Sequence, residues 1–201
     1  MSQALIMLCK YPLPGQVKTR IAADTSDQIA ADIQSRMLNY IIKNHNNHIE
    51  YDLVIWLRQA QLLVQFESDY WCHHKHNFIQ QWDNLGEIID HAIKYGLQYY
   101  DRIIIIWSDT PLITQEDIIE WYKKLNEIDI IVWPVTDGWY WCIGTSQVVS
   151  KIVVPITYST NTVLQDTIDR LNHHTLSYSL LETKTDIDTI DLRNDIAHLI
   201  P

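Results

Sequence analysis

Glycine is scarce in this chain, with five glycines among 201 residues against eight tryptophans and nine histidines. Backbone can approach a phosphate most closely where there is no side chain, so few glycines count against a generous glycine-rich nucleotide loop. The GxxxxGK[ST] spacing of a P-loop is absent as well. The sequence therefore excludes the P-loop class of nucleotide-binding proteins.

The chain also has fewer positively charged than negatively charged residues. The chain has 15 Lys and Arg residues against 25 Asp and Glu residues, a formal net charge of −10 and a pI near 5.2. Proteins that bind nucleic acid carry basic faces that release counterions from the phosphate backbone. This balance argues against a nucleic-acid partner, and the acidic surface mainly favours solubility.

Disulfide pairs and long apolar runs are missing too. The three cysteines, Cys9, Cys72 and Cys142, lie far apart and form no CxxC pair. We interpret them as reduced, buried thiols of a cytosolic protein. No apolar run approaches the ~18 residues of a membrane span, and no basic segment followed by an apolar stretch begins the chain. We expect a cytoplasmic protein.

The most informative stretch that is present is IIIIWSDTP, residues 103–111. Four consecutive isoleucines suit a strand buried on both faces, as in a parallel sheet. Ser108, Asp109 and Thr110 follow directly, at the carboxyl end of the strand, where ligands bind in open α/β sheets. Asp109 is therefore a candidate to hold a phosphate-bound metal ion. The alternative is that Asp109 only caps a turn or the next helix.

A second candidate segment follows the first predicted strand, residues 4–9. KYPLPGQVKTR, residues 10–20, contains two prolines and a glycine, which forbid regular structure, and three cations, Lys10, Lys18 and Arg20. A cationic loop that leads into a helix N-terminus suits a diphosphate. The alternative is a solvated surface loop whose cations balance nearby acids.

Helical and extended patterns alternate through the rest of the chain. Apolar spacing predicts a helix over 26–44, with Ile29, Ile33, Met37 and Ile41 on its buried face. Asp137-Gly138 predicts a hairpin turn, and Ser159 or Thr160 is the expected cap of a late helix. The other predicted elements are strands at 51–57, 78–81, 129–133, 139–143 and 176–181 and helices at 59–67, 84–99, 115–126, 161–173 and 190–199.

The length and this alternation predict a single α/β domain over 1–201. His73, His74 and His76 lack the ligand spacing of a metal site. Trp139 and Trp141 could cover the edge of the sheet or form a platform for a sugar or acceptor. The abundance of aromatic residues leaves room for a homodimer surface.

Taken together, these stretches resemble a family. The order of ALIMLCKYPLPGQVKTRIA, NLGEIIDHAI, WSDTPLIT, DIIVWPVTDGWYWCIG, ITYSTNTVLQDTIDR and TDIDTIDL resembles that of small GT-A-fold transferases. The specific resemblance is to the nucleotide-diphospho-sugar transferase-like proteins, of the rSAM/selenodomain-associated glycosyltransferase type. These are distantly similar to bacterial cytidylyl-, guanylyl- and molybdopterin-guanine transferases. The resemblance covers nearly the whole chain, and KYPLPGQVKTR is its most specific element.

The resemblance implies a three-layer α/β/α, Rossmann-like GT-A sandwich with a mostly parallel central sheet. It further implies that Lys10, Gly15, Lys18 and Arg20 contact phosphate or shape the first loop.

The resemblance also assigns the acids. Asp109 would hold Mg²⁺ or Mn²⁺, and Asp188, with Asp186 nearby, would supply a second carboxylate. Asp137 would orient an acceptor hydroxyl or act as a base. Such an ion takes one or two protein carboxylates and neutralises charge on the leaving group.

Four positions depart from the family pattern. Trp107 and Trp139 stand where the family usually has glycine, Asn84 replaces an acid, and Ile88 replaces an arginine. An indole there would fill volume beside the nucleotide or sugar, and loss of the arginine removes a bidentate partner.

Three functions remain open at this stage. The first is a metal-dependent glycosyltransferase that uses a nucleotide-diphospho-sugar donor and an acceptor with a hydroxyl group. The second is a nucleotidyltransferase that joins a nucleoside triphosphate to a phosphorylated small molecule and releases pyrophosphate. The third, motivated by the four departures, is an inactive homologue that binds a nucleotide or a protein.

Overall fold

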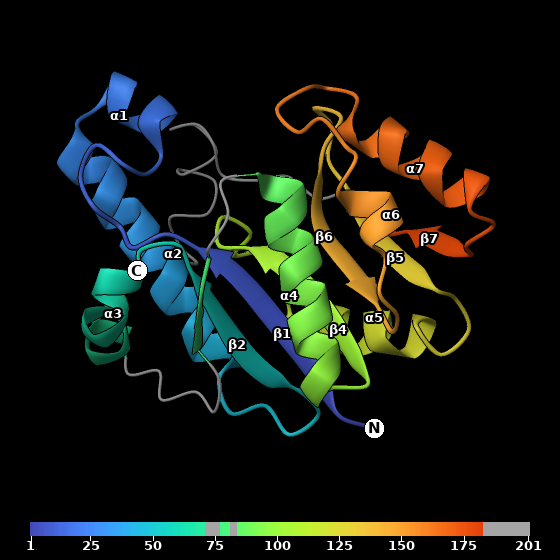
Figure 1. Cartoon of the computed structure of the whole chain (residues 1–201). Helices are drawn as coiled ribbons and strands as arrows, with labels where there is room; N and C mark the ends of the chain where they lie inside the picture. Colours follow the sequence, from blue (N-terminus) through green and yellow to red (C-terminus); the bar gives the residue numbers. More distant parts are fainter. Residues whose placement is uncertain (71–76, 81–83, 183–201) are drawn as a thin grey trace.

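A single seven-stranded sheet forms the centre of the molecule, in the order β3-β2-β1-β4-β6-β5-β7 (Figure 1). The computed structural model describes residues 1–70, 77–80 and 84–182. The strands are β1 (Gln3–Cys9), β2 (Asp52–Leu57), β3 (Asn77–Ile79), β4 (Arg102–Trp107), β5 (Ile130–Pro134), β6 (Tyr140–Thr145) and β7 (Tyr178–Leu180). β6 is antiparallel to both of its neighbours, and the other strand pairs are parallel. The prediction of a mostly parallel sheet is confirmed.

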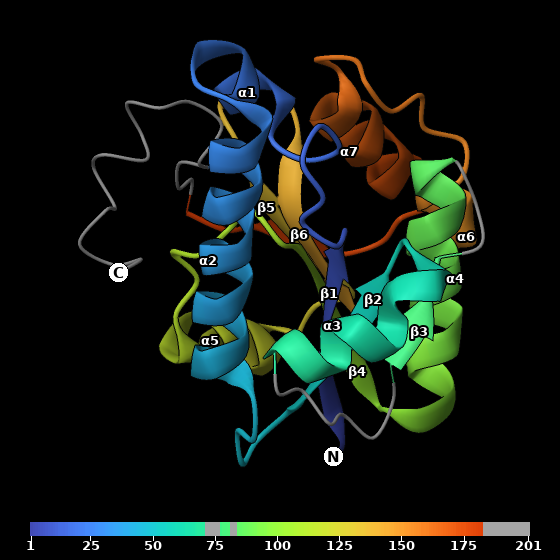
Figure 2. The ribbon, with the colours of Figure 1, turned by 90° about the vertical axis from the view of Figure 1, so that its left-hand side faces the viewer.

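Helices cover both faces of the sheet, as the two perpendicular views show (Figures 1 and 2). One hydrophobic cluster joins the sheet to α2, α3 and α5, and another joins it to α4, α6 and α7. The helices are α1 (Thr19–Asp24), α2 (Asp27–His45), η1 (Ala60–Leu62), α3 (Leu63–Tyr70), α4 (Leu85–Tyr99), α5 (Gln115–Lys124), α6 (Ser150–Val153) and α7 (Val163–His173). The predicted three-layer α/β/α fold is confirmed.

The core follows from the strand sequences. Successive side chains of a strand point to opposite faces, so Ile104 and Ile106 contact one helical layer while Ile103 and Ile105 contact the other. All four isoleucines are fully buried. β4 is therefore the strand covered on both faces that its unbroken apolar run predicts.

The predicted hairpin forms between β5 and β6. Val135 N–H donates to the carbonyl of Trp139 at 3.0 Å, and Gly138 has a φ of +89°. β6 then pairs with β4 on its other side, so it lies between two strands that precede it in the chain.

Two local predictions are wrong. Ile29 is 41% exposed, because the buried face of α2 is centred on Ala30, Met37 and Ile41 instead. The N-cap of α7 is Thr162, and its side chain makes no capping bond. Ser159 lies too early to cap the helix and has a φ of +76°.

Some predictions fall outside the described residues. These are the helix over 190–199, the turn with Asp186 and Asp188, the three adjacent histidines and Cys72. Cys9 and Cys142 are buried free thiols. None of the described helices is long and apolar enough to cross a membrane.

Candidate functional site

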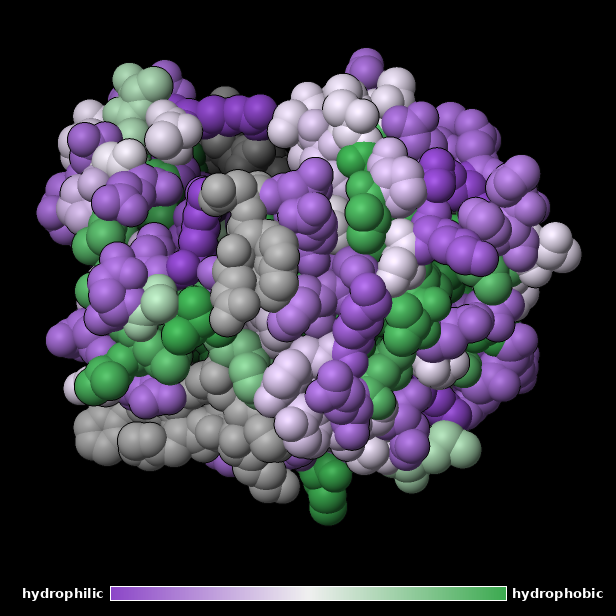
Figure 3. Space-filling model, in the orientation of Figure 1, coloured by the Kyte–Doolittle hydropathy of each residue, from purple (hydrophilic) through white to green (hydrophobic). Residues whose placement is uncertain are grey.

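A cavity of about 560 Å³ opens at the carboxyl ends of the parallel strands β1, β2 and β4. Figure 3 shows a mostly hydrophilic surface that is hollowed between the α1 region and the segment that precedes α7. The described residues that line the cavity are Leu8, Cys9, Lys10, Gln16, Val17, Lys18, Thr19, Arg20, Gln34, Arg58, Gln80, Leu85, Ile88, Trp107, Ser108, Asp109 and Ser159. The sheet edge predicted to bind a ligand is thus the edge that carries the cavity.

Four cations face this cavity. Lys10, Lys18 and Arg20 come from the loop after β1 and the start of α1, and Arg58 directly follows β2. Asp109 is the one acid among the described lining residues. In a chain of net charge −10, this local excess of positive charge favours anions over cations in the cavity.

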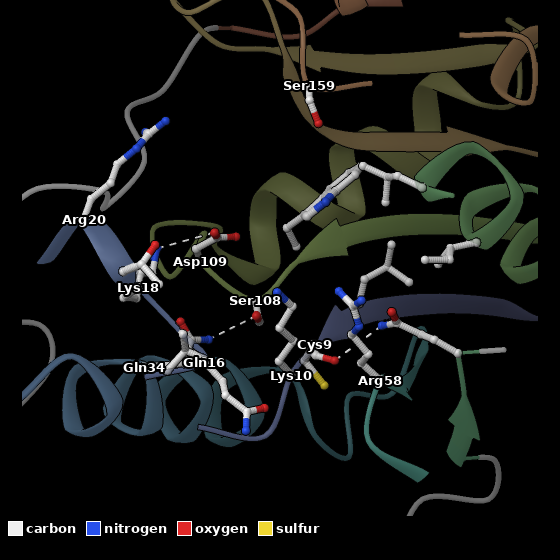
Figure 4. Close-up of a pocket in the computed structure, with 17 residues that line it drawn as sticks. Cys9, Lys10, Gln16, Lys18, Arg20, Gln34, Arg58, Ser108, Asp109 and Ser159 are labelled. Carbon is white, nitrogen blue, oxygen red and sulfur yellow. Dashed lines mark hydrogen bonds and ion pairs between the residues drawn. The ribbon is translucent and has the colours of Figure 1, made fainter. Parts of the chain in front are cut away.

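The side chains of Lys18 and Asp109 point toward each other (Figure 4). The distance from Lys18 Nζ to Asp109 Oδ2 is 3.4 Å, and the two side chains are 5% and 25% exposed. Lys18 has the left-handed backbone angles φ 46° and ψ 47° and is the N-cap of α1. A non-glycine residue adopts these angles at a cost of about 1–3 kcal/mol, and such residues concentrate at functional sites.

Lys10 and Arg58 lie side by side in the lower part of the same view (Figure 4). Partial burial lowers the pKa of Lys10, the positive charge of Arg58 lowers it further, and Asp109 opposes both effects. Two adjacent cations that repel each other are stabilised when an anion binds between them. Their pairing therefore favours a phosphate ligand.

The segment that carries Asp109 is held by hydrogen bonds. Gln34, a buried residue of α2, donates from Nε2 to Ser108 Oγ at 3.1 Å. Thr110 Oγ1 donates to the carbonyl of Trp107 at 2.7 Å, and Ser108 N–H donates to the carbonyl of Leu8 at 3.2 Å. These bonds hold Ser108, before Asp109, to β1 and α2, and Thr110, after Asp109, to the end of β4.

Other predicted site residues lie elsewhere. Gly15 is exposed, has a φ of +76° and is outside the described lining of the cavity, so its effect is on the shape of the loop. Asp137 is exposed in the β5–β6 turn, where its Oδ1 accepts from Trp139 N–H at 3.1 Å. The structure does not bring Asp137 into the described lining of the cavity. Asp188 lies outside the described residues.

The four departures from the family pattern have structural roles. Trp107 lines the cavity and contacts Tyr140 and Trp141 at ring centroid distances of 5.8 and 6.5 Å. Asn84 caps α4 by accepting from Gly86 N–H at 2.8 Å, and Ile88 is 5% exposed in the core. Trp139 packs against Tyr158. The indole of Trp107 thus narrows the cavity without filling it.

Several lining residues are not among those that the sequence predicted. Arg58 directly follows a strand, as Lys10 does, so the rule that found Lys10 would also have found Arg58. Gln80 follows β3 and donates from Nε2 to the carbonyls of Cys9 and Trp56. Gln34 and Ser159 carry no local signal, because only the packing of α2 and the α6–α7 segment brings them to the site.

The side chains that line the cavity suit Mg²⁺ or Mn²⁺ held partly by substrate phosphates better than a metal ion held by protein ligands alone. No cluster of three or more His, Cys, Asp or Glu residues occurs in the described part of the chain. Mg²⁺ is usually bound by one or two carboxylates together with substrate phosphates and waters. Asp109 beside the four cations that line the cavity matches that pattern.

The sheet order and the helices on both faces define a Rossmann-like α/β protein with a GT-A-like fold. Residues 41–160 match the family described as "Uncharacterized protein conserved in bacteria (DUF2064)", and the chain belongs to this family. No curated protein matches the chain.

Solved structures support the same fold. A protein from Desulfovibrio desulfuricans G20, named as a candidate nucleotide-diphospho-sugar transferase, has a TM-score of 0.88 and 24% identity, over 100% of this chain and 97% of that one. CMP:2-keto-3-deoxy-manno-octonic acid synthetase complexed with CTP has a TM-score of 0.61 and 9% identity, over 99% and 98%. A cytidylyltransferase from Leptospira borgpetersenii serovar Hardjo-bovis has a TM-score of 0.62 and 14% identity, over 98% and 87%. The resemblance inferred from the sequence motifs is confirmed.

Proposed function

We propose that this protein is a transferase acting on a nucleotide-activated donor, most directly a nucleotide-diphospho-sugar, with a hydroxyl group as acceptor. The observation that carries the proposal is the convergence of Lys10, Lys18, Arg20 and Arg58 on one cavity beside a single described carboxylate. The name of the Desulfovibrio desulfuricans protein points to the same donor class. The whole chain, 1–201, would act as one domain.

In this proposal the cations hold the diphosphate. Arg20 and Arg58 suit bidentate contacts to phosphate oxygens, and Lys10 and Lys18 act as point charges. Fixing the donor near the acceptor and stabilising the leaving diphosphate would supply most of the catalysis, with no covalent intermediate.

Asp109, together with Asp188, would hold Mg²⁺ or Mn²⁺, which would neutralise charge on the leaving group. Gln34 and Ser108 would keep Asp109 in place. Asp137 would orient the acceptor or act as its base, which requires an acceptor long enough to extend from the cavity to the β5–β6 turn.

A nucleotidyltransferase is the second candidate. Its support is the charge of the described lining, four cations against one acid. A nucleoside triphosphate and a phosphorylated partner carry more negative charge than a sugar nucleotide and a neutral acceptor. The fold shared with a synthetase in complex with CTP agrees with this candidate.

The inactive homologue is the third candidate, and Trp107 is its main support. The indole lines the cavity where the family usually has glycine. A cavity of about 560 Å³ nevertheless remains beside it, which is enough for a small-molecule ligand.

One titration series tests all three. Nucleoside diphosphates, triphosphates and sugar nucleotides are added with and without Mg²⁺, and binding is followed by the fluorescence of Trp107 with Trp107→Phe as the optical control. Release of a nucleoside diphosphate supports the glycosyltransferase, and release of pyrophosphate from a triphosphate supports the nucleotidyltransferase. Binding without turnover supports the inactive homologue, and no binding at all contradicts the proposal.

A further inference from the structure

A phosphate at this site would bind Lys18, and a divalent cation would bind Asp109. In this structure the two side chains form an ion pair with each other. Lys18 Nζ lies 3.4 Å from Asp109 Oδ2. The ammonium side chain is 5% exposed and the carboxylate side chain 25% exposed, so bulk water screens the pair only in part. The ion pair therefore lowers the affinity of Lys18 for an anion and the affinity of Asp109 for a cation.

The backbone holds Lys18 in this position. Its left-handed angles of φ 46° and ψ 47° fall at the junction between the loop and α1. The neighbouring Val17 is 6% exposed and Ile21, in the first turn of α1, is fully buried. Both anchors fix the backbone at the start of the helix, so the ammonium can leave Asp109 only by rotation about the bonds of the Lys18 side chain.

The electrostatic consequence works in both directions. An ammonium this close to the carboxylate repels a divalent cation from the same oxygen. The carboxylate in turn neutralises the ammonium and weakens its attraction for a phosphate. Each ligand alone must break the ion pair, but an anion and a cation that arrive together satisfy both side chains.

We propose that the Lys18–Asp109 ion pair couples the two ligands of this site. A phosphate anion draws Lys18 away and thereby releases Asp109 to a divalent cation, so that each ligand strengthens the binding of the other. By linkage the coupling is the same in both directions. This inference rests on the proposed function only for the identity of the anion and the cation.

The first test measures Mn²⁺ binding by electron paramagnetic resonance, with no nucleotide present. Lys18→Met keeps the unbranched shape and most of the length of the side chain and removes its charge. We expect it to bind Mn²⁺ at least about tenfold more tightly than the wild type, because the ammonium no longer occupies the carboxylate. Arg20→Met is the matched control, since it removes one positive charge from the same cavity but not from the Asp109 pair.

The second test measures binding of inorganic pyrophosphate by calorimetry in metal-free buffer with a chelator. We expect Asp109→Asn to bind pyrophosphate several-fold more tightly than the wild type, since the Asp109 charge then neither attracts Lys18 nor repels the anion. Asp169→Asn is the matched control, because this exposed acid of α7 lies outside the described lining of the cavity. Thermal unfolding of each variant confirms that it is folded.

The results separate this inference from the proposed function. If Lys18→Met binds Mn²⁺ no more tightly than the wild type or Arg20→Met, the coupling is wrong, even if nucleotides bind. If Asp109→Asn folds and does not gain pyrophosphate affinity, the coupling is also wrong. If both variants behave as expected but no nucleotide binds the wild type, the coupling stands and the proposed function fails. Should Asp109→Asn not fold, the Lys18→Met result decides alone.

Discussion

Arg58 and Lys10 each follow a neighbouring parallel strand, and each strand ends at the same edge of the sheet. Their proximity lowers the pKa of Lys10, after the larger effect of its partial burial. A phosphate between them would remove the repulsion. Arg58, which the sequence motifs did not identify, is therefore the first residue to test by mutation.

Arg58→Met is expected to weaken nucleotide binding by about tenfold or more, because a charge-assisted hydrogen bond to phosphate is lost. The same change should raise the pKa of Lys10 toward its ordinary value. Calorimetry measures the first effect and NMR titration of the lysine side chains the second. Arg170→Met, on α7 where Arg170 donates to the carbonyl of Lys151, is the control. Equal affinities for wild type and Arg58→Met would remove Arg58 from the site.

The first-loop motif and the Asp109 strand end predicted much of the site at the residue scale. Lys10 and Asp109 are predicted from charge at strand ends, and Lys18 and Arg20 from the cationic loop after the first strand; all four line one cavity. Their catalytic and binding roles stay predictions. The pairing of Lys18 with Asp109 could not be foreseen, because it depends on the left-handed backbone of a lysine, a conformation that residue type does not indicate.

At the scale of elements, the segments between strands determine how the cavity is built. The β5–β6 turn contacts the α6–α7 segment, since Leu164 N–H donates to the carbonyl of Gly138 at 2.9 Å. A Cβ at Gly138 would lie 1.9 Å from the carbonyl oxygen of Asn161. The turn therefore supports the segment that carries Ser159 to the far wall of the cavity (Figure 4).

Gly138→Ala is expected to destabilise the protein by more than Gly15→Ala, although both glycines have a positive φ. The backbone cost is about 1–2 kcal/mol in each case. At Gly15 the atom nearest to an added Cβ is Asp27 Oδ2 at 3.4 Å, which is an ordinary contact. At Gly138 an added Cβ would clash with the backbone carbonyl of Asn161. Urea unfolding of the two variants measures the difference. Similar losses of stability would show that the contact with Asn161 relaxes easily.

His45 joins three elements. Its Nε2 donates to the carbonyl of Ile113 at 3.2 Å, because a carbonyl can only accept, and Nδ1 therefore accepts from Tyr51 OH at 2.7 Å. The ring is 1% exposed, and its burial lowers the pKa of His45 despite the opposing bond to Ile113. This contact fixes the loop that follows Asp109 to the end of α2.

The stability of the protein is expected to fall as the pH drops below 6.5, the ordinary value for His45. The unfolded chain then binds a proton that the folded histidine resists, so stability falls by at most about 1.4 kcal/mol per pH unit for this one group. Urea unfolding between neutral and mildly acidic pH measures the slope. His45→Gln should flatten it, and His173→Gln, at an exposed site, should not. An unchanged slope in His45→Gln would assign the acid sensitivity to other groups.

At the scale of the whole molecule, a cationic cavity is set in an acidic protein. The chain carries a net charge of −10, yet the described lining of the cavity is positive. The acidic remainder of the surface repels anionic ligands at long range. Binding therefore depends on charges close to the ligand, which salt screens strongly only when the screening length becomes as short as these contacts.

Nucleotide affinity is expected to fall as the salt concentration rises from about 0.01 M to about 1 M, over which the screening length shrinks from about 30 Å to about 3 Å. Calorimetric titrations along a NaCl series measure the slope, and Arg58→Met should show a shallower one. Affinity that does not change with salt would mean that apolar contacts, rather than the four cations, hold the nucleotide.

The fold class was predictable because local patterns and overall topology agree. The isoleucines of β4, the hairpin signal at Asp137-Gly138 and the amphipathic pattern of α4 each indicated the element that forms. Strand order was not predictable from such patterns. Only the long-range pairing of Ile143 with both Ile105 and Val132 places β6 between β4 and β5.

That insertion has a consequence for synthesis of the chain on the ribosome. Before residues 140–145 emerge, β4 and β5 have no strand between them, and each presents an unpaired, apolar edge. A nascent chain stalled at that length would expose unpaired strand edges, which can associate with other polypeptide chains. Translation through this short stretch closes the two edges that β4 and β5 present to each other, and leaves the far edge of β5 to be covered by β7.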